Sequence, residues 1–244
     1  MKAAPEAQRR LLDLQAVDTT LAKLAHRRRS LPELAEIDAV AREISALEDE
    51  RVRAQVVVDD LDRDIARLEK DIDQVRLRKD KDQKRLDAGA AMREIEGLQH
   101  ELATLNRRQS ELEDAELELM EQRETAVATL ADVQARIAAA VGRRTDAERR
   151  RDEANDEIAK ELEFKTQSRV PLAADLPADL VTLYDKIRSE TGMGAALVHA
   201  GRCGACRIEL YGADLNRVKA APKDDVVRCE ECRRIMIRTA ESGL

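Results

Sequence analysis

Four cysteines in two pairs are the residues of this chain whose types and spacing could support chemistry. They form Cys203-Gly204-Ala205-Cys206 and Cys229-Glu230-Glu231-Cys232, with twenty-two residues between the pairs. Two residues between paired cysteines allow a tight turn to direct both sulfurs at one centre, and four thiolates complete a tetrahedral zinc shell without an open position. The spacing therefore predicts one structural Zn²⁺ ion, held by Cys203, Cys206, Cys229 and Cys232.

Other uses of four cysteines fit the sequence less well. Disulfides suit small secreted domains, whereas we expect no signal peptide here and all the cysteines fall in one short segment. An iron-sulfur cluster also takes four cysteines and remains an alternative to zinc. A thioredoxin-like site needs one pair within an alternating strand and helix pattern. His199 lies close to the first pair in sequence, but four thiolates already fill the zinc shell.

The elements that must position these cysteines are short. Segments 195–199, 207–211, 226–228 and 235–238 read as β segments, and several flank a cysteine pair. A zinc ribbon is built in this way, with the metal replacing a core too small to fold alone. A short helix is expected from about residue 178 to 189, and Tyr184 lies on its apolar face as a core residue rather than as a base-stacking one.

The rest of the chain predicts long helices. Of 244 residues 38% are charged, and the only aromatic side chains are one Phe and two Tyr, so a large globular core is not expected. From residue 33 to 87 the apolar positions alternate steps of three and four, which is a coiled-coil pattern, and a second such run follows from 92 to 165. Gly89, between the runs, supplies the backbone freedom for a reversal. The predicted fold class is mainly α, a long antiparallel coiled-coil hairpin followed by a small β-rich zinc ribbon.

Breaks in these patterns set the expected boundaries. Residues 1–168 form the hairpin, with its tip near 88–91 and a kink near 30–32, where Ser30 and Glu33 read as a capping box for a new helix. Residues 169–177, which contain Pro171 and Pro177, are predicted to be a linker. Residues 178–244 hold the short helix and the ribbon.

Charge is unevenly distributed between these parts. The net charge of the whole chain is −7. Residues 202–238 have nine basic and six acidic side chains, a net of +3, whereas residues 1–199 carry 34 basic and 43 acidic groups, a net of −9. A basic ribbon suits contacts to the phosphates of RNA or DNA, although stacking aromatic side chains are scarce. The candidate contacts are Arg202, Arg207, Arg217, Lys219, Arg228, Arg233, Arg234 and Arg238.

A protein adaptor that docks a partner on the coiled coil is the alternative function, because several positions in the helical seam are polar. An enzyme is not expected. His26, His100 and His199 are far apart in sequence, and four thiolates leave no site for a reactive water. No segment has the length of apolar sequence that a membrane span needs. We therefore expect a cytoplasmic monomer or homodimer.

Taken together, these motifs resemble a bacterial family of coiled-coil proteins that end in a four-cysteine zinc ribbon, long catalogued as a domain of unknown function. The resemblance rests on Leu98-Gln99-His100-Glu101-Leu102, on residues 180–188, and on the cysteine pairs followed by Arg234-Ile235-Met236-Ile237. It implies the hairpin and ribbon fold. It also implies nucleic-acid or RNA binding, or a chaperone or adaptor role in flagellar or secretion systems. The family usually has Gly after the last cysteine, so Arg233 is expected to need a positive φ angle there.

Overall fold

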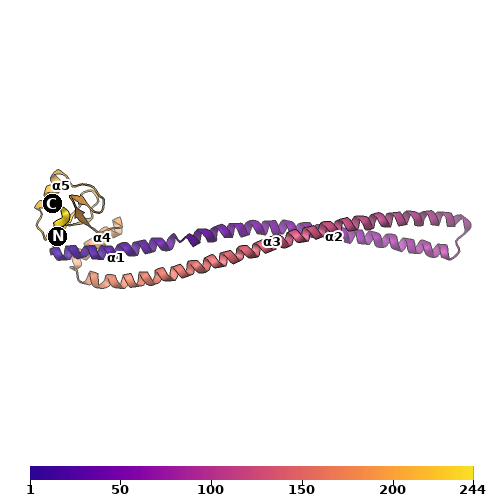
Figure 1. Cartoon of the computed structure of the whole chain (residues 1–244), viewed down its shortest axis with the longest axis horizontal. Coiled ribbons are helices and arrows are strands. Elements are labelled where there is room, and N and C mark those ends of the chain that lie inside the picture. The colour runs from indigo at the N-terminus through magenta and orange to yellow at the C-terminus, as the bar shows by residue number, and fades with distance from the viewer. Residues whose placement is uncertain (244) are drawn as a thin grey trace. The chain divides into compact units, whose positions relative to one another are not determined.

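The structure, a computed structural model, describes residues 1–243, and the chain divides into two compact units. One unit spans Ala35–Glu148. The other combines Met1–Leu34 with the chain from Arg149 onward. The predicted fold class is confirmed, since a long helical hairpin precedes a small sheet that carries the four cysteines (Figure 1). Among residues 1–243, no helix has a stretch apolar enough over sufficient length to cross a lipid bilayer.

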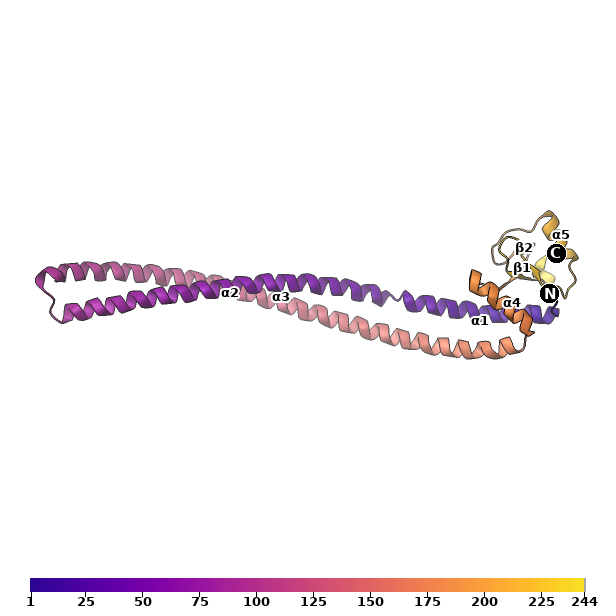
Figure 2. The ribbon, with the colours of Figure 1, turned by 180° about the vertical axis from the view of Figure 1, so that it is seen from behind.

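The unit from Ala35 to Glu148 is an antiparallel helix pair. It is formed by parts of α2 (Pro32–Asp87) and α3 (Met92–Ala174), which lie side by side in both views (Figures 1 and 2). The chain reverses over residues 88–91, where Gly89 has a φ of 86°. Small and branched apolar side chains fill the seam, namely Val40, Ile44, Leu47, Ile137 and Ala140. The period of the apolar residues therefore produces the expected buried stripe.

Polar residues at the seam find partners across the hairpin. The Lys79 ammonium donates a hydrogen bond to Gln109 Oε1 at 2.7 Å. The Arg123 guanidinium pairs with Asp62 on the opposite helix. Arg143 bonds to Glu43 at 2.7 Å, further along the same pair of helices. These polar pairs weaken the apolar seam but fix which residues face one another.

In the other unit, α1 (Pro5–Arg29) ends at a two-residue break. Ser30 ends α1 rather than capping the next helix, because its hydroxyl donates to the His26 carbonyl at 3.0 Å. The predicted capping box is therefore wrong. Leu31 is buried against Leu24 and Ile158, so an apolar contact fixes the break.

The predicted linker over residues 169–177 is also wrong for most of its length. Helix α3 continues through Pro171 to Ala174, and only residues 175–177 separate it from α4 (Ala178–Thr191). Proline lacks a backbone N–H and usually disrupts the interior of a helix. Only residues 172–174 of α3 follow Pro171, so little of the helix is affected. Leu176 and Leu180 are then buried with α1, so this connection belongs to a packed core.

The ribbon contains a four-stranded sheet in the order β2-β1-β4-β3. Its strands are β1 (Ala195–His199), β2 (Arg202–Cys203), β3 (Val227–Arg228) and β4 (Ile235–Ile237). Strands β1 and β4 are parallel, and the other neighbours are antiparallel. The predicted strand over 207–211 is wrong, because only Glu209 bridges to the sheet. Helix α5 (Gly212–Ala220), which was not predicted, follows it, and the 3-10 helix η1 (Ala240–Ser242) follows β4.

Side chains of β4 enter two different cores. Ile235 and Ile237 join the core formed with α1 and α4, whereas Met236 joins the core that includes Cys203 and Cys229. All three side chains are fully buried, as expected for a strand covered on both faces, where successive side chains alternate direction. The metal-ligating loops are thus attached to a sheet that is itself packed on helices.

The N-terminal residues pair with the ribbon beside α5 (Figure 1). The Ala3 N–H donates to the Asp224 carbonyl at 2.8 Å, and the Val226 N–H donates to the Met1 carbonyl at 3.1 Å. Lys2 adds an ion pair with Asp224 at 3.0 Å. These bonds hold residues 1–3 against residues 224–226 of the ribbon.

Candidate metal centre

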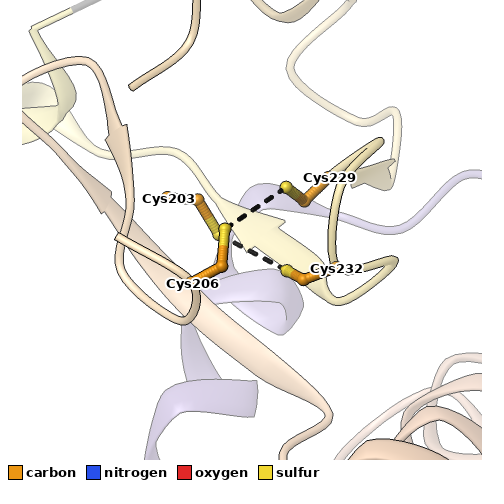
Figure 3. A group of neighbouring side chains, drawn as sticks. All are labelled: Cys203, Cys206, Cys229 and Cys232. Carbon is orange, nitrogen blue, oxygen red and sulfur yellow. Dashed lines mark hydrogen bonds between the residues drawn. The ribbon is translucent and has the colours of Figure 1, made fainter. Parts of the chain in front are cut away.

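The four cysteine sulfurs converge on one point (Figure 3). The Sγ atoms of Cys203 and Cys232 are 3.8 Å apart, those of Cys206 and Cys229 are 3.9 Å apart, and all four lie within 4.8 Å of one another. A tetrahedron with zinc-sulfur bonds of about 2.3 Å has sulfur-sulfur edges of about 3.8 Å. None of the four is in a disulfide. The donor set therefore fits a single zinc ion, as predicted, and its short edges leave no room for an iron-sulfur cage.

The two cysteine loops share one backbone geometry. In the first loop, Arg207 N–H donates to the Cys203 carbonyl at 2.8 Å, and Cys203 N–H donates to the Ile208 carbonyl at 3.0 Å. In the second, Arg233 N–H donates to the Cys229 carbonyl at 2.8 Å, and the Cys229 N–H donates to the Arg234 carbonyl at 3.0 Å. We call these loops, residues 203–207 and 229–233, the two knuckles. Their equivalence brings four sulfurs to one centre from two separate segments.

Each knuckle ends on an arginine in the left-handed region. The φ angle is 63° at Arg207 and 60° at Arg233. The positive φ expected at Arg233 is therefore present, and the first knuckle has the same feature. A residue with a side chain pays roughly 1–2 kcal/mol of backbone strain to adopt such a φ angle, whereas glycine adopts it readily. The chain thus carries two strained arginines, each directly after a cysteine ligand.

Gly204 allows the first knuckle to lie against β1. Its N–H donates to the Leu197 carbonyl at 2.9 Å, and a Cβ at this position would meet that same oxygen at 2.3 Å. Any side chain would have to push the knuckle away from the strand. Close packing of backbone on backbone therefore explains why the smallest residue stands between the first two ligands.

Burial and hydrogen bonding act in opposite directions on the thiols. Burial raises the pKa of Cys203, although N–H groups of Cys206 and Ala205 bonded to its sulfur oppose the shift. Burial likewise raises the pKa of Cys229 to about 12. The buried thiols therefore hold their protons at neutral pH when no metal is present. A bound cation must displace these protons, so metal binding releases protons to solvent.

Two of the predicted nucleic-acid contacts hold the ribbon together instead of facing solvent freely. The Arg234 guanidinium donates to the Thr191 carbonyl at 2.8 Å and to the Met193 carbonyl at 3.2 Å, at the end of α4. Arg238 donates to four carbonyls at 2.7–3.1 Å at the end of α5, those of Val218, Ala221, Pro222 and Asp225. Positive charge is favourable at the C-terminal ends of helices, where carbonyls lack partners.

The other six candidate side chains are exposed, and they differ in whether they form ion pairs or hydrogen bonds within the chain. Arg202 pairs with Glu209 at 2.7 Å, and Arg217 pairs with Glu230 at 2.9 Å. Arg228 uses its Nε to reach the Arg233 carbonyl at 2.9 Å. The side chains of Arg207, Lys219 and Arg233 make no hydrogen bond or ion pair with any residue from 1 to 243. Within the described residues, these last three are the members of the predicted set whose side chains make neither a hydrogen bond nor an ion pair. His199 is exposed and lies outside the sulfur cluster.

A buried polar network that the sequence did not predict connects the ribbon to the helices of its unit. Asp18 on α1 accepts hydrogen bonds from Arg169 Nε and from the Tyr184 hydroxyl, both at 2.8 Å. Gln15, one turn earlier, accepts from the Gly194 and Ala195 N–H groups at 2.7 and 3.2 Å, where β1 begins. Tyr184 is fully buried, as predicted. The sequence does contain one signal of this network, because Gln15 and Asp18 occupy positions on the helix face that is otherwise filled by leucines.

Comparison with known proteins agrees with this geometry. Residues 14–192 match the CT398-like coiled coil hairpin domain, and residues 202–236 match a C4-type zinc ribbon domain. The first match covers most of the chain. The protein belongs to the CT398-like family.

CT398-like relatives extend over the whole chain. An uncharacterised protein of Mycobacterium tuberculosis is 38% identical over 239 residues, which is 98% of each chain. A solved structure from Mycobacterium smegmatis is 37% identical, covers 98% of this chain and all of its own, and has a TM-score of 0.88. CT398 of Chlamydia trachomatis is 19% identical over 96% of this chain and 98% of its own, with a TM-score of 0.69. The last similarity concerns the fold alone.

Proposed function

We propose that the zinc ribbon is a non-enzymatic nucleic-acid-binding module, and that Arg207 and Arg233 are its principal phosphate contacts. The observation that supports this most is the pair of strained arginines at equivalent places in the two knuckles. Glycine would occupy either position without strain, so the backbone gains nothing from arginine there. Both guanidinium groups are exposed and have no side-chain partner among residues 1–243.

Guanidinium is well suited to phosphate because its planar donors bind two oxygens at once. Each arginine directly follows a cysteine ligand, so the metal centre would hold both backbones in place and limit the entropy lost on binding. Acidic neighbours lower the local potential, since Glu230 and Glu231 lie in the second knuckle, although Glu230 is engaged by Arg217. We therefore expect moderate, salt-dependent binding to the backbone of RNA or DNA with little base specificity.

Glycine substitution separates this role from a structural one. The double variant Arg207→Gly/Arg233→Gly is expected to be more stable by on the order of 1 kcal/mol per site, because strain is relieved. It is also expected to lose affinity for a labelled single-stranded RNA or DNA. The slope of log affinity against log salt should fall in magnitude by about 0.7 for each arginine removed. Fluorescence anisotropy gives the affinity, and zinc release in increasing denaturant gives the stability.

The matched control is Arg207→Lys/Arg233→Lys, which keeps both the positive charge and a side chain at each strained position. It should keep the salt dependence of binding and an unchanged stability, with an affinity between those of the wild type and the glycine variant, because lysine contacts phosphate as a point charge. A double glycine variant that binds as tightly as the wild type would refute the assignment. So would the absence of any binding by the zinc-loaded wild type at low salt.

A protein adaptor is the second candidate, and it is favoured by exposed valines on α2. Val52, Val56 and Val57 are each about half exposed, at 52%, 49% and 49%, on adjacent turns of the helix. Val52 and Val56, four residues apart, share a face that an apolar stripe of a partner helix would cover. Neighbouring exposed apolar side chains often mark an interaction surface, whereas a single exposed apolar side chain is common on any protein.

A photo-crosslinking residue at position 56, introduced in native cells, tests the adaptor role. The expected result is one dominant crosslinked protein, identified by mass spectrometry and lost when Val52 is changed to lysine. The same probe at Val141, an exposed valine on α3, is the control position and should capture no such partner. Equal yields from the two positions would count against a specific partner, and a crosslink to a second copy of this chain would indicate a homodimer.

A further inference from the structure

A basic cavity lies at the C-terminal end of α5. Its volume is about 640 Å³, within the range of small-molecule sites. Three segments form its walls: the first turns of α1, the end of α5 with the residues after it, and the residues that lead into η1. The lining residues that matter here are Pro5, Arg9, Val218, Lys219, Lys223 and Arg238.

The charge of this cavity is strongly one-sided. Four cationic side chains line it, and none of its lining residues is acidic. Lys219 and Lys223 have no side-chain partner among residues 1–243. Arg238 donates only to backbone carbonyls and forms no direct salt bridge with a carboxylate among residues 1–243. Arg9 is paired with Glu6, but at 3.3 Å between two exposed groups, which is a weak interaction.

The walls are tied together by buried hydrogen bonds. Gln8 is 3% exposed, and its amide nitrogen donates to the Ala3 carbonyl at 2.8 Å and to the Lys223 carbonyl at 3.1 Å. The bonds from Arg238 join the end of α5 to the residues after it. A ligand would therefore meet a site whose backbone is already ordered, which reduces the entropy cost of binding.

We propose that this cavity binds a phosphate monoester that carries a flat, largely apolar ring, the chemistry of a nucleoside monophosphate. Lysine and arginine side chains from separate segments supply the charge that a phosphate dianion needs. Pro5, Ala221 and Ala240, which are all at least partly exposed, supply apolar wall for the ring. The phosphate can come from a free nucleotide or from the phosphorylated 5′ end of a nucleic-acid strand. The site is separate from the knuckle arginines and does not depend on them.

Calorimetric titration of the zinc-loaded full chain at low salt tests this site with adenosine monophosphate, adenosine and inorganic phosphate. The monophosphate is expected to bind, with inorganic phosphate at least tenfold weaker and adenosine without measurable binding. A fourth arm compares one oligonucleotide with and without a 5′ phosphate. Competition between the phosphorylated strand and the monophosphate would place a strand end in the cavity, and its absence would leave the free nucleotide as the ligand.

Lys219→Glu/Lys223→Glu should weaken binding of the monophosphate at least tenfold. The matched control is Lys23→Glu/Lys160→Glu, which changes the net charge equally at two exposed lysines of the same unit that lie outside the cavity. Zinc content and circular dichroism of both variants show whether they are folded. Arg207→Gly/Arg233→Gly should leave nucleotide binding unchanged, so this site and the proposed nucleic-acid surface can fail separately.

Three results would overturn the proposal. One is equal weakening by the two double lysine variants, since that would reflect net charge alone. Another is equal affinity for the monophosphate and inorganic phosphate, since the apolar wall would then contribute nothing. The third is no detectable heat and no shift in thermal unfolding at about 1 mM monophosphate, the weak limit of ordinary ligand affinity.

Discussion

Cys229→Ser is expected to release the metal and unfold the ribbon. Cys229 is one of the two buried members of the sulfur cluster, and its loss leaves three thiolates in a site shaped for four. Structural zinc supplies about 10–16 kcal/mol of apparent binding energy at neutral pH, far more than cores of this size usually provide. Elemental analysis should show less than one zinc per chain. Amide hydrogen exchange should show loss of protection in β1 to β4, whereas the helices within residues 35–148 stay protected.

The control for this variant is Ala205→Ser, which places the same hydroxyl in a knuckle without removing a ligand. It should retain one zinc per chain and native protection. Because the pKa of Cys229 is raised to about 12 by burial, zinc must displace a proton from it, and the apparent affinity should rise with pH. Stoichiometric zinc in the serine variant, with the ribbon still protected, would contradict the metal's structural role.

Asp18→Ala is expected to cost about 1–3 kcal/mol in the unit that carries the ribbon, because it removes the buried acceptor of the Tyr184 hydroxyl and one of the two carboxylates that pair with Arg169, the other being Asp185. The side chain of Asp18 is 1% exposed, and that of Arg169, its ion-pair partner at 2.8 Å, is 21% exposed. The variant also removes the acceptor of the buried Tyr184 hydroxyl, whose pKa is raised by burial and by that hydrogen bond.

Hydrogen exchange at the amides of α4 measures this effect locally, where whole-chain unfolding would be dominated by the long helices. The control is Asp13→Ala, an exposed aspartate on the same helix, which should change protection little. Asp18→Asn should fall between the two, since its amide oxygen can still accept from Tyr184 while Arg169 keeps only Asp185 as a counter-charge. Equal protection in the two alanine variants would show that the network contributes no net stability.

Features encoded by local spacing could be predicted from the sequence. The cysteine pairs and the heptad repeats each repeat a short pattern, so the metal ligands and the helical hairpin followed directly. Gly89 marked the reversal for the same reason. The positive φ at Arg233 could be expected because the family that the sequence resembles usually has Gly at this position.

What could not be predicted depends on partners distant in sequence. Arg234 and Arg238 read as surface charges because the carbonyls that they bind belong to helix ends and to the loop after α5, 13 to 43 residues away. Residues 207–211 alternate like a strand, yet the only bridge in that segment is from Glu209. Pro171 was interpreted as a helix breaker because the sequence alone does not show that it lies within the last turn of α3. In each case tertiary contacts decided the outcome.

The pairing of residues 1–3 with residues 224–226 has a consequence for the order of folding. Lys2 and Asp224 are separated by 222 positions, so residues 1–3 are synthesised long before the residues with which they pair. Closing so long a loop adds little to the equilibrium cost, because that cost rises only with the logarithm of length. It does slow assembly, since contacts between remote segments form late. The long helices should therefore form before the ribbon is complete.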